Sequence, residues 1–274
     1  MKIRSLTLFV VTFLTGCGGG GKEEGGGLIV SSFEEAPVSG RYSAEGRVVT
    51  TGLDATSDKV IVTSAPGFSN GTMAFVNFAG ELQSVQVNGR SYSGIDAEGG
   101  FVLLQNGSSF LRISDPDWAI YQVHAAGYTD AGTSSGTMFG MVAGYETDAS
   151  SLPAAGGASY SGSVDGVYID ETGIGYLTSG EISLITTDFA SVDLVISGTS
   201  KALLSDPNAL SAPELDFTAT DLTLLNGQYS GTVTSDGMSG DVNGRFYGPA
   251  AQETGGVISA SGTAGYFEAG FGAD

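Results

Sequence analysis

The sequence predicts an all-β protein whose C-terminal half forms an eight-stranded antiparallel up-and-down β-barrel, preceded by a small β handle-like subdomain. Three observations support this. The chain is rich in Gly, Ser, Thr, Val and Tyr, with 44 glycines among its 274 residues. No stretch long enough for a helix shows a convincing 3.6-residue period. Short runs of alternating apolar and polar residues recur instead between Gly, Asn and Asp clusters, as is typical of strands joined by turns.

Residues 1–16 are predicted to be a lipoprotein signal peptide. Lys2 and Arg4 precede an apolar run that has about half the length that a membrane-spanning helix needs. The run ends in Leu14-Thr15-Gly16-Cys17, which resembles a bacterial lipobox. Cys17 is the one cysteine of the chain, and we expect it to be the lipidated first residue of the mature protein rather than a buried core residue.

Residues 17–36 are predicted to be a flexible tether. Positions 18–27 contain only Gly, Lys and Glu, and Gly-rich segments of this kind behave as flexible coils. The tether would hold a folded body away from the membrane, which the body would contact only through the lipid. With a single cysteine, no disulfide can form within the chain.

The charge of the chain is strongly acidic. It carries 30 acidic and 10 basic residues, for a formal net charge of −20. Nucleic acid is excluded as a partner because its phosphates require basic patches. The acidity also opposes contact between the body and anionic lipid. The excess of acidic residues can serve solubility, and it can equally serve to attract a basic partner.

Residues 37–117 are predicted to form the handle-like subdomain. Asn106-Gly107 between two apolar runs is a strong hairpin signal. The predicted strands are 41–50, 59–63, 72–78, 81–88, 101–104 and 109–114. Turn signals also occur at Pro66-Gly67, Asn70-Gly71 and Asn88-Gly89. Four arginines lie in this segment, and we interpret them as scattered surface residues rather than a binding face: Arg41, Arg47, Arg90 and Arg112.

Residues 118–274 are predicted to form the barrel. A meander of about eight to ten strands with short connections can close on itself, which removes exposed edges. With eight strands, the interior is filled by side chains or holds one small ligand. A membrane-spanning barrel is excluded because the strands show no tall apolar outer band. The predicted strands are 119–128, 136–145, 157–168, 173–185, 192–203, 214–224, 228–234, 239–247, 255–261 and 266–270.

One motif near the C-terminus is unusual for an all-β chain. Pro249 suits the first position of a single helical turn, and Gly255 suits the left-handed position after it. Residues 244–256 resemble the Gly-x-Phe-Tyr-Gly-Pro-x-Ala-x-Glu-x-Gly-Gly signature of the transferrin-binding-protein-B-like surface lipoproteins. The matching residues are Gly244, Phe246, Tyr247, Gly248, Pro249, Ala251, Glu253, Gly255 and Gly256. Weaker matches are Thr147, residues 152–156 and 158–162, Asp188-Phe189, and Phe271-Gly272-Ala273.

This resemblance implies a fold and a location. It implies a handle followed by an eight-stranded barrel, related to that of factor H binding protein. It also implies display on the outer membrane by an export protein of the surface lipoprotein assembly modulator kind. Members of the family bind host transferrin, haem-carrying proteins or complement factor H. Their partner-binding loops have no recognisable counterpart here, and this chain has room for only one lobe. We therefore assign the signature a folding role and leave the ligand-binding residues unassigned.

The sequence predicts no catalytic residue, no cofactor and no metal site, and we expect the protein not to be an enzyme. Residues 132–136 fit the Gly-x-Ser-x-Gly motif of hydrolases, but they lie in a loop between strands rather than in a strand-to-helix turn. His124, the one histidine, is expected to be a solvated or hydrogen-bonded strand residue. The carboxylates of Asp115, Asp117 and Asp170-Glu171 lack the spacing of a calcium loop, and we expect exposed turns there.

The sequence favours a non-catalytic binding module anchored to the outer membrane. Its partner would be an extracellular macromolecule or an iron or haem carrier, bound by the handle and by loops at one barrel end. One alternative is a small-ligand binder that holds haem or another apolar solute inside the barrel. The other alternative is a structural or protective surface protein without a dedicated ligand.

Overall fold

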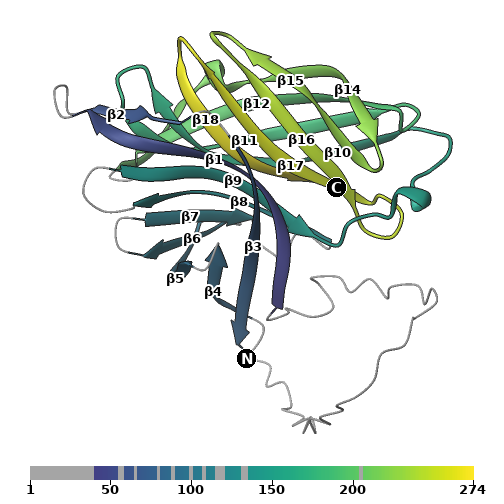
Figure 1. Ribbon diagram of the computed structural model, residues 1–274, viewed down its shortest axis with the longest axis horizontal. Coiled ribbons are helices and arrows are strands. Elements are labelled where there is room, and N and C mark those ends of the chain that lie inside the picture. The colour runs from purple at the N-terminus through teal and green to yellow at the C-terminus, as the bar shows by residue number, and fades with distance from the viewer. Residues whose placement is uncertain are drawn as a thin grey trace, which may run out of the picture.

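The computed structural model shows two β-sheets that pack against each other (Figure 1). It describes residues 40–54, 59–64, 67–78, 81–87, 90–98, 101–106, 109–114, 121–130, 135–203 and 206–274. Regular structure in these residues is almost entirely strand, with two short 3₁₀ turns, η1 (Ala149–Ser151) and η2 (Pro213–Leu215). The all-β prediction is confirmed.

The first sheet contains nine strands within the described residues, in the order β2-β1-β3-β4-β5-β6-β7-β8-β9. The long strand β1 pairs with β3 along residues 40–48 and with β9 along residues 44–52, so the sheet closes on itself. Its interior holds buried apolar side chains such as Leu111 and Met141. The strands are β1 (Gly40–Asp54), β2 (Lys59–Val62), β3 (Gly67–Phe78), β4 (Glu81–Val87), β5 (Arg90–Glu98), β6 (Phe101–Asn106), β7 (Ser109–Ser114), β8 (Gln122–Asp130) and β9 (Ser135–Gly144).

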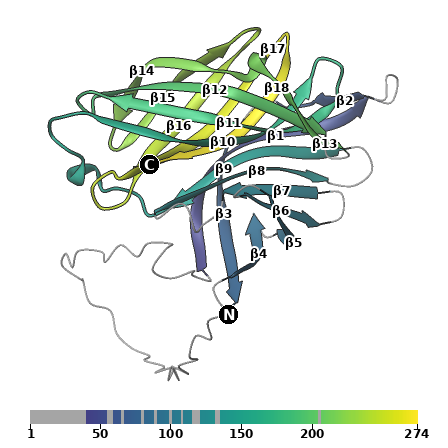
Figure 2. The same ribbon diagram turned by 180° about the vertical axis from the view of Figure 1, so that it is seen from behind.

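The second sheet is the predicted barrel. Eight of its described strands are neighbours in chain order, and the pairings of β10 with β18 and of β11 with β12 complete the ring (Figure 2). Strand β13 extends β12 as a side hairpin. The strands are β10 (Ala158–Asp170), β11 (Gly175–Thr186), β12 (Ser191–Leu203), β13 (Asp206–Ser211), β14 (Thr218–Leu225), β15 (Gln228–Ser235), β16 (Met238–Tyr247), β17 (Glu253–Gly262) and β18 (Gly265–Ala273). The up-and-down barrel is therefore confirmed.

Several local predictions differ from the structure. Strands β5 and β13 were not predicted, and Asn70-Gly71, predicted as a turn, lies within β3, where both residues pair with β1. The predicted hairpin between β6 and β7 is present, with Asn106 opposite Ser109. Because β8 pairs with β7 and β9, the chain leaves the first sheet after Gly144 rather than after residue 117.

Aromatic side chains fill the barrel interior. The ring of Phe246 lies 5.7 Å from the rings of both Tyr160 and Tyr229, measured between centroids. In the same barrel core, the rings of Phe217 and Phe267 stack with their centroids 5.3 Å apart. All five side chains are almost fully buried. Each stabilises the fold by about 1.5–3 kcal/mol, and together they occupy the space that a ligand inside the barrel would need.

The two sheets meet where β8 and β9 pack against β10, β17 and β18, a zone that we call the junction. Glycines allow their backbones to touch. A Cβ atom added at Gly140 would lie 2.1 Å from the carbonyl oxygen of Ala269. One added at Gly270 would lie 2.6 Å from the carbonyl oxygens of Ala125 and Met141. Such distances are far below van der Waals contact, so these positions require glycine.

Candidate functional sites along the junction

The signature residues end β16, form a turn and begin β17. The turn spans residues 248–251, and its left-handed residues are Gly248 (φ 84°) and Ala251 (φ 57°). The prediction of a helical turn that ends at a left-handed Gly255 is wrong. Gly255 and Gly256 are part of β17, where they pair with Arg245 and Gly244 of β16, because the strand ladder resumes at Glu253. Gly248, not Gly255, supplies the required conformational freedom.

The weaker sequence matches converge on the signature in space. The ring of Phe189 lies 5.3 Å from that of Phe246, measured between centroids. The hydroxyl of Thr147 donates to the carbonyl oxygen of Gly248 at 2.6 Å. Segments more than 50 residues apart in the sequence therefore form one packed unit at the barrel end that contains the turn 248–251, which we call the signature end.

Glu253 joins the signature to the first sheet. The side chain is only 3% exposed, and its Oε2 atom accepts from the backbone N–H groups of Tyr121 and Gln122 at 3.1 and 3.0 Å. These bonds fix the start of β8. Tyr247, also buried, packs with Tyr121 and with Val142 of β9. The signature residues therefore make contacts at the junction as well as within the barrel.

Two of the four arginines that were predicted to be scattered over the surface, Arg47 and Arg112, instead pair with carboxylates of the second sheet. Asp165 of β10 is fully buried, with Arg112 Nε 2.8 Å and His124 Nε2 3.2 Å from its carboxylate oxygens. These arginines have acidic partners far away in the sequence, which composition alone does not reveal. Three Arg–carboxylate pairs connect the two sheets within the described residues: Arg47–Asp241 and Glu45–Arg245 between β1 and β16, and Arg112–Asp165 between β7 and β10.

The outer face of β10 changes from polar to apolar along the junction. Ser161 and Ser163 border a cavity of about 630 Å³, which we call the polar junction pocket. Farther along β10, beyond Asp165, Val167 and Ile169 border a cleft of about 210 Å³, which we call the apolar junction cleft. Buried Asp165 lies between the two. Because alternate residues of a strand share a face, one strand lines both cavities.

The apolar junction cleft lies at the barrel end opposite the signature, which we call the loop end. The turns 171–174, 236–237 and 263–264 and the β12–β13 hairpin form this end. Strand β2 is attached here, since the N–H of Val60 donates to the carbonyl oxygen of Gly173 at 3.3 Å. A second cavity of about 160 Å³ shares Val60 and Ile169 with the cleft. The exposed large apolar residues of the loop end are Ile61, Ile174, Leu203, Leu210 and Tyr266.

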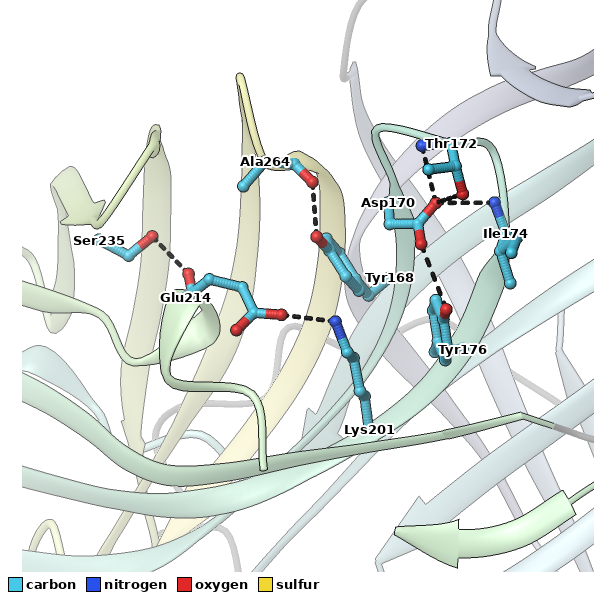
Figure 3. Close-up of polar contacts among 9 residues, drawn as sticks. All are labelled: Tyr168, Asp170, Thr172, Ile174, Tyr176, Lys201, Glu214, Ser235 and Ala264. Atoms are coloured by element: carbon cyan, nitrogen blue, oxygen red, sulfur yellow. Dashed lines mark hydrogen bonds and ion pairs between the residues drawn. The ribbon is translucent and has the colours of Figure 1, made fainter. Parts of the chain in front are cut away.

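A cluster of polar side chains lies at the loop end (Figure 3). Lys201 Nζ lies 2.6 Å from Glu214 Oε1 and 5.2 and 5.1 Å from the ring centroids of Tyr168 and Tyr176. Burial and nearby carboxylates raise the pKa of Tyr168. Burial opposes ionisation of Asp170, but hydrogen bonds from its turn and from Tyr176 outweigh it and lower the pKa of this carboxyl. Lys201 of β12 thus connects rings of β10 and β11 with the carboxylate of η2.

The remaining predicted residues are placed as follows. His124 is a buried, hydrogen-bonded strand residue, and Asp170 closes its own turn by accepting from Thr172 and Ile174. Cys17, Asp115, Asp117 and residues 132–134 of the Gly-x-Ser-x-Gly motif lie outside the described residues. Within the part of the chain that the structure describes, no three His, Cys, Asp or Glu side chains are grouped to hold a metal ion. The helical segments in that part are also too short to cross a membrane.

Comparison with known proteins supports the fold. No family model and no curated protein sequence matches the chain. Transferrin-binding protein B from serogroup B Neisseria meningitidis has a similar structure, with a TM-score of 0.50 and 16% identity over 84% of this chain and 43% of that one. The haemoglobin receptor HpuA from Kingella denitrificans gives a TM-score of 0.47 and 13% identity over 86% of each chain.

A variant of transferrin-binding protein B from Haemophilus parasuis Hp5 gives a TM-score of 0.44 and 17% identity over 83% of this chain and 44% of that one. The present chain thus spans less than half the length of these transferrin-binding proteins. The present chain has one closed eight-stranded barrel packed on one smaller sheet. It therefore has the fold of a transferrin-binding-protein-B-like lobe.

Proposed function

We propose that this protein is a lipid-anchored surface protein that binds an extracellular protein, such as an iron or haem carrier, through its loop end. The observation that carries the proposal is the apolar surface there. Ile61 and Tyr266, which are 43% and 37% exposed, border the second cavity of the loop end. Ile174, which is 46% exposed, lies in the chain between Gly173 of that cavity and Gly175 of the apolar junction cleft. Exposed apolar groups gathered around a cleft are typical of protein-binding sites.

The chemistry around the cleft indicates what kind of partner fits. Asp170 and Glu171 border the second cavity of the loop end, and Glu214 lies beside Lys201. A partner that inserts one apolar or aromatic side chain into the cleft and surrounds it with basic residues would complement both features. The overall charge of −20 would also accelerate encounter with such a partner.

A pair of matched variants tests the docking surface. Ile174→Asp places a charge among the exposed apolar residues of the loop end, whereas Ile185→Asp makes the same change at a similarly exposed residue, 51% exposed, near the signature end of β11. Surface plasmon resonance would measure binding to transferrin, to haemoglobin and to proteins captured from host fluid. We expect Ile174→Asp to weaken binding at least tenfold and Ile185→Asp to leave it unchanged. Equal effects of the two variants would refute the loop end as the docking surface.

The proposed location rests on the N-terminal sequence. A signal peptide at 1–16, lipidation at Cys17 and a tether up to residue 36 would anchor the body by lipid alone, and surface display would require an export protein of the surface lipoprotein assembly modulator kind. Protease treatment of intact cells tests this. We expect cleavage within the tether and release of the body, whereas complete protection in intact cells and cleavage only after lysis would place the protein on the periplasmic side.

Two alternatives predict other results. A ligand inside the barrel would have to displace buried rings such as Phe246 and Tyr229, and the filled interior offers this hypothesis no support. A protective surface protein without a dedicated ligand would show no saturable binding. Deletion of its gene would leave growth normal on every iron source and alter surface properties instead.

A further inference from the structure

The polar junction pocket lies at the opposite end of the junction from the proposed docking surface. It has a volume of about 630 Å³, within the range of small-molecule sites. Its walls come from both sheets: Gln122 and His124 from β8, Ser161 and Ser163 from β10, and Glu181 from β11. Because it is assembled from both sheets, its shape depends on the junction and not on a flexible loop.

Two buried side chains of the pocket carry polar atoms that are not paired. Gln122 is 4% exposed and His124 is 1% exposed. Gln122 Oε1 and His124 Nδ1 are buried and have no hydrogen-bond partner among the described residues. An unpaired buried polar atom costs about 1–3 kcal/mol, so native proteins retain few of them without a ligand or water to pair with.

The unpaired amide oxygen of Gln122 is a hydrogen-bond acceptor, because an amide oxygen can only accept. His124 Nε2 lies 3.2 Å from the buried carboxylate of Asp165, which in turn is paired with Arg112. In the tautomer in which Nε2 donates to this carboxylate, His124 Nδ1 is a second acceptor. The pocket therefore offers acceptors for a ligand that donates.

Carboxylates add negative charge to the same pocket. Glu253, which borders the pocket, accepts from the backbone N–H groups of Tyr121 and Gln122. Glu181 is exposed and forms no ion pair within the described part of the chain. Four serines on the walls supply further hydroxyls: Ser114, Ser161, Ser163 and Ser183. Since no three metal-binding side chains are grouped in the described residues, the charge favours an organic cation over a metal ion.

We propose that the polar junction pocket binds a small organic cation with several N–H donors, of the polyamine or guanidine class. Its N–H groups would pair with Gln122 Oε1 and with the serine hydroxyls, while its charge would be matched by Glu181. The pocket volume accommodates a whole molecule of this class and not merely one guanidinium group. This site is separate from the loop end, so either proposal can fail without the other.

Isothermal titration calorimetry of the full-length protein with agmatine and spermidine tests the proposal. We expect saturable binding that weakens as salt is added, because ion pairs at a partly open site are screened. Glu181→Gln should weaken binding about tenfold, the effect of removing one charged hydrogen-bond partner. Asp221→Asn is the matched control, since it removes the same charge from β14 at a left-handed residue that Asn tolerates, and it should leave affinity unchanged.

Three further probes distinguish the ligand classes. A short Arg-containing peptide with blocked termini reports whether the pocket prefers a side chain of a partner protein to a free molecule. Tighter binding of the peptide would overturn the assignment of a free ligand. Equal binding of a neutral polyol such as sorbitol, or tighter binding of Ca²⁺, would overturn the cation class. An equal loss of binding in Glu181→Gln and Asp221→Asn would show a non-specific charge effect and overturn the site.

Discussion

Glu268 shows what burial at the junction does to a single ionisable residue. It lies on β18 and is 1% exposed, and the hydroxyl of Ser259 donates to its Oε1 atom at 2.5 Å. Burial raises the pKa of Glu268 to about 8, although this hydrogen bond and the positive charge of Arg47 act in the opposite direction. The group is therefore largely protonated in the folded protein at neutral pH, while it is ionised in the unfolded chain.

The stability of the protein should depend on this proton. Between the ordinary value of 4.5 and about 8, the folded state holds a proton that the unfolded state has lost. The contribution of Glu268 to the free energy of unfolding then falls as pH rises, by at most about 1.4 kcal/mol per pH unit. Glu268→Gln cannot ionise and should remove this fall. Urea denaturation of both proteins at pH 5 and pH 8 measures it, and parallel changes in the two proteins would contradict the raised pKa.

At the scale of elements, the β14–β15 hairpin turns through two left-handed residues. Asn226 and Gly227 have φ values of 52° and 78°, as the two-residue turns that match the strand twist require. Leu225 and Gln228 pair across the turn. A Cβ atom at Gly227 would come no closer than 3.7 Å to any atom beyond the two neighbouring residues in the chain; the nearest is the carbonyl oxygen of Thr147. A substitution there thus changes the conformational energy without a clash.

Gly227→Ala should lower the free energy of unfolding by about 1 kcal/mol, because a left-handed conformation disfavours a side chain. Gly175→Ala is the control. Gly175 also begins a strand at a turn, has open space around its Cα atom and lies outside the left-handed region. Chemical denaturation compares the two variants. Equal stabilities would show that the turn relaxes to another conformation.

Individual strands could be predicted where alternation was regular, but β5 and β13 were missed. β5 contains Gly94 and Asp96, and β13 begins with Asp206-Pro207-Asn208. All of these residues favour turns locally, and they form strands here because neighbouring strands offer them partners. Conversely, Asn70-Gly71 has the composition of a turn but is extended within β3, which shows that sheet pairing overrides local preference.

At the scale of the whole molecule, the close approach of the two sheets depends on glycine. A side chain at Gly140 would collide with the backbone of Ala269, which cannot move without shifting β18. Gly140→Ala should therefore lower the free energy of unfolding by about 1–3 kcal/mol, the usual cost of overpacking. Differential scanning calorimetry measures it against the same change at Gly175. An unchanged Tm would show that the sheets can separate freely.

The buried charges of the junction give a second whole-molecule prediction. Asp165→Asn keeps the size of the side chain but leaves Arg112 and His124 without their carboxylate partner. Breaking one side of a buried ion pair costs about 3–5 kcal/mol. Asp221→Asn, which removes an exposed carboxylate, should cost much less. A similar loss of stability in both variants, measured by urea denaturation, would contradict a specific role for the pair.

The sequence predicts the barrel and the signature, but not the junction. Alternation and turn residues are local, so the strand order of a meander follows from them. The partners of Arg47 and Arg112 lie on the other sheet and are far away in the sequence. Likewise, Glu253 was recognised as part of a motif, but the N–H groups that it binds belong to β8. Contacts between sheets of this kind require the three-dimensional arrangement.

The way both rings close has a consequence for how the chain folds. β1 pairs with β9, and β10 pairs with β18, so each ring joins its first strand to its last. As synthesis proceeds from the N-terminus, the first ring can close once β9 has emerged, whereas the barrel must wait for residues 265–273. Contacts this distant in sequence form slowly, in milliseconds to seconds. A chain exported as it emerges would therefore cross a membrane before its barrel can close.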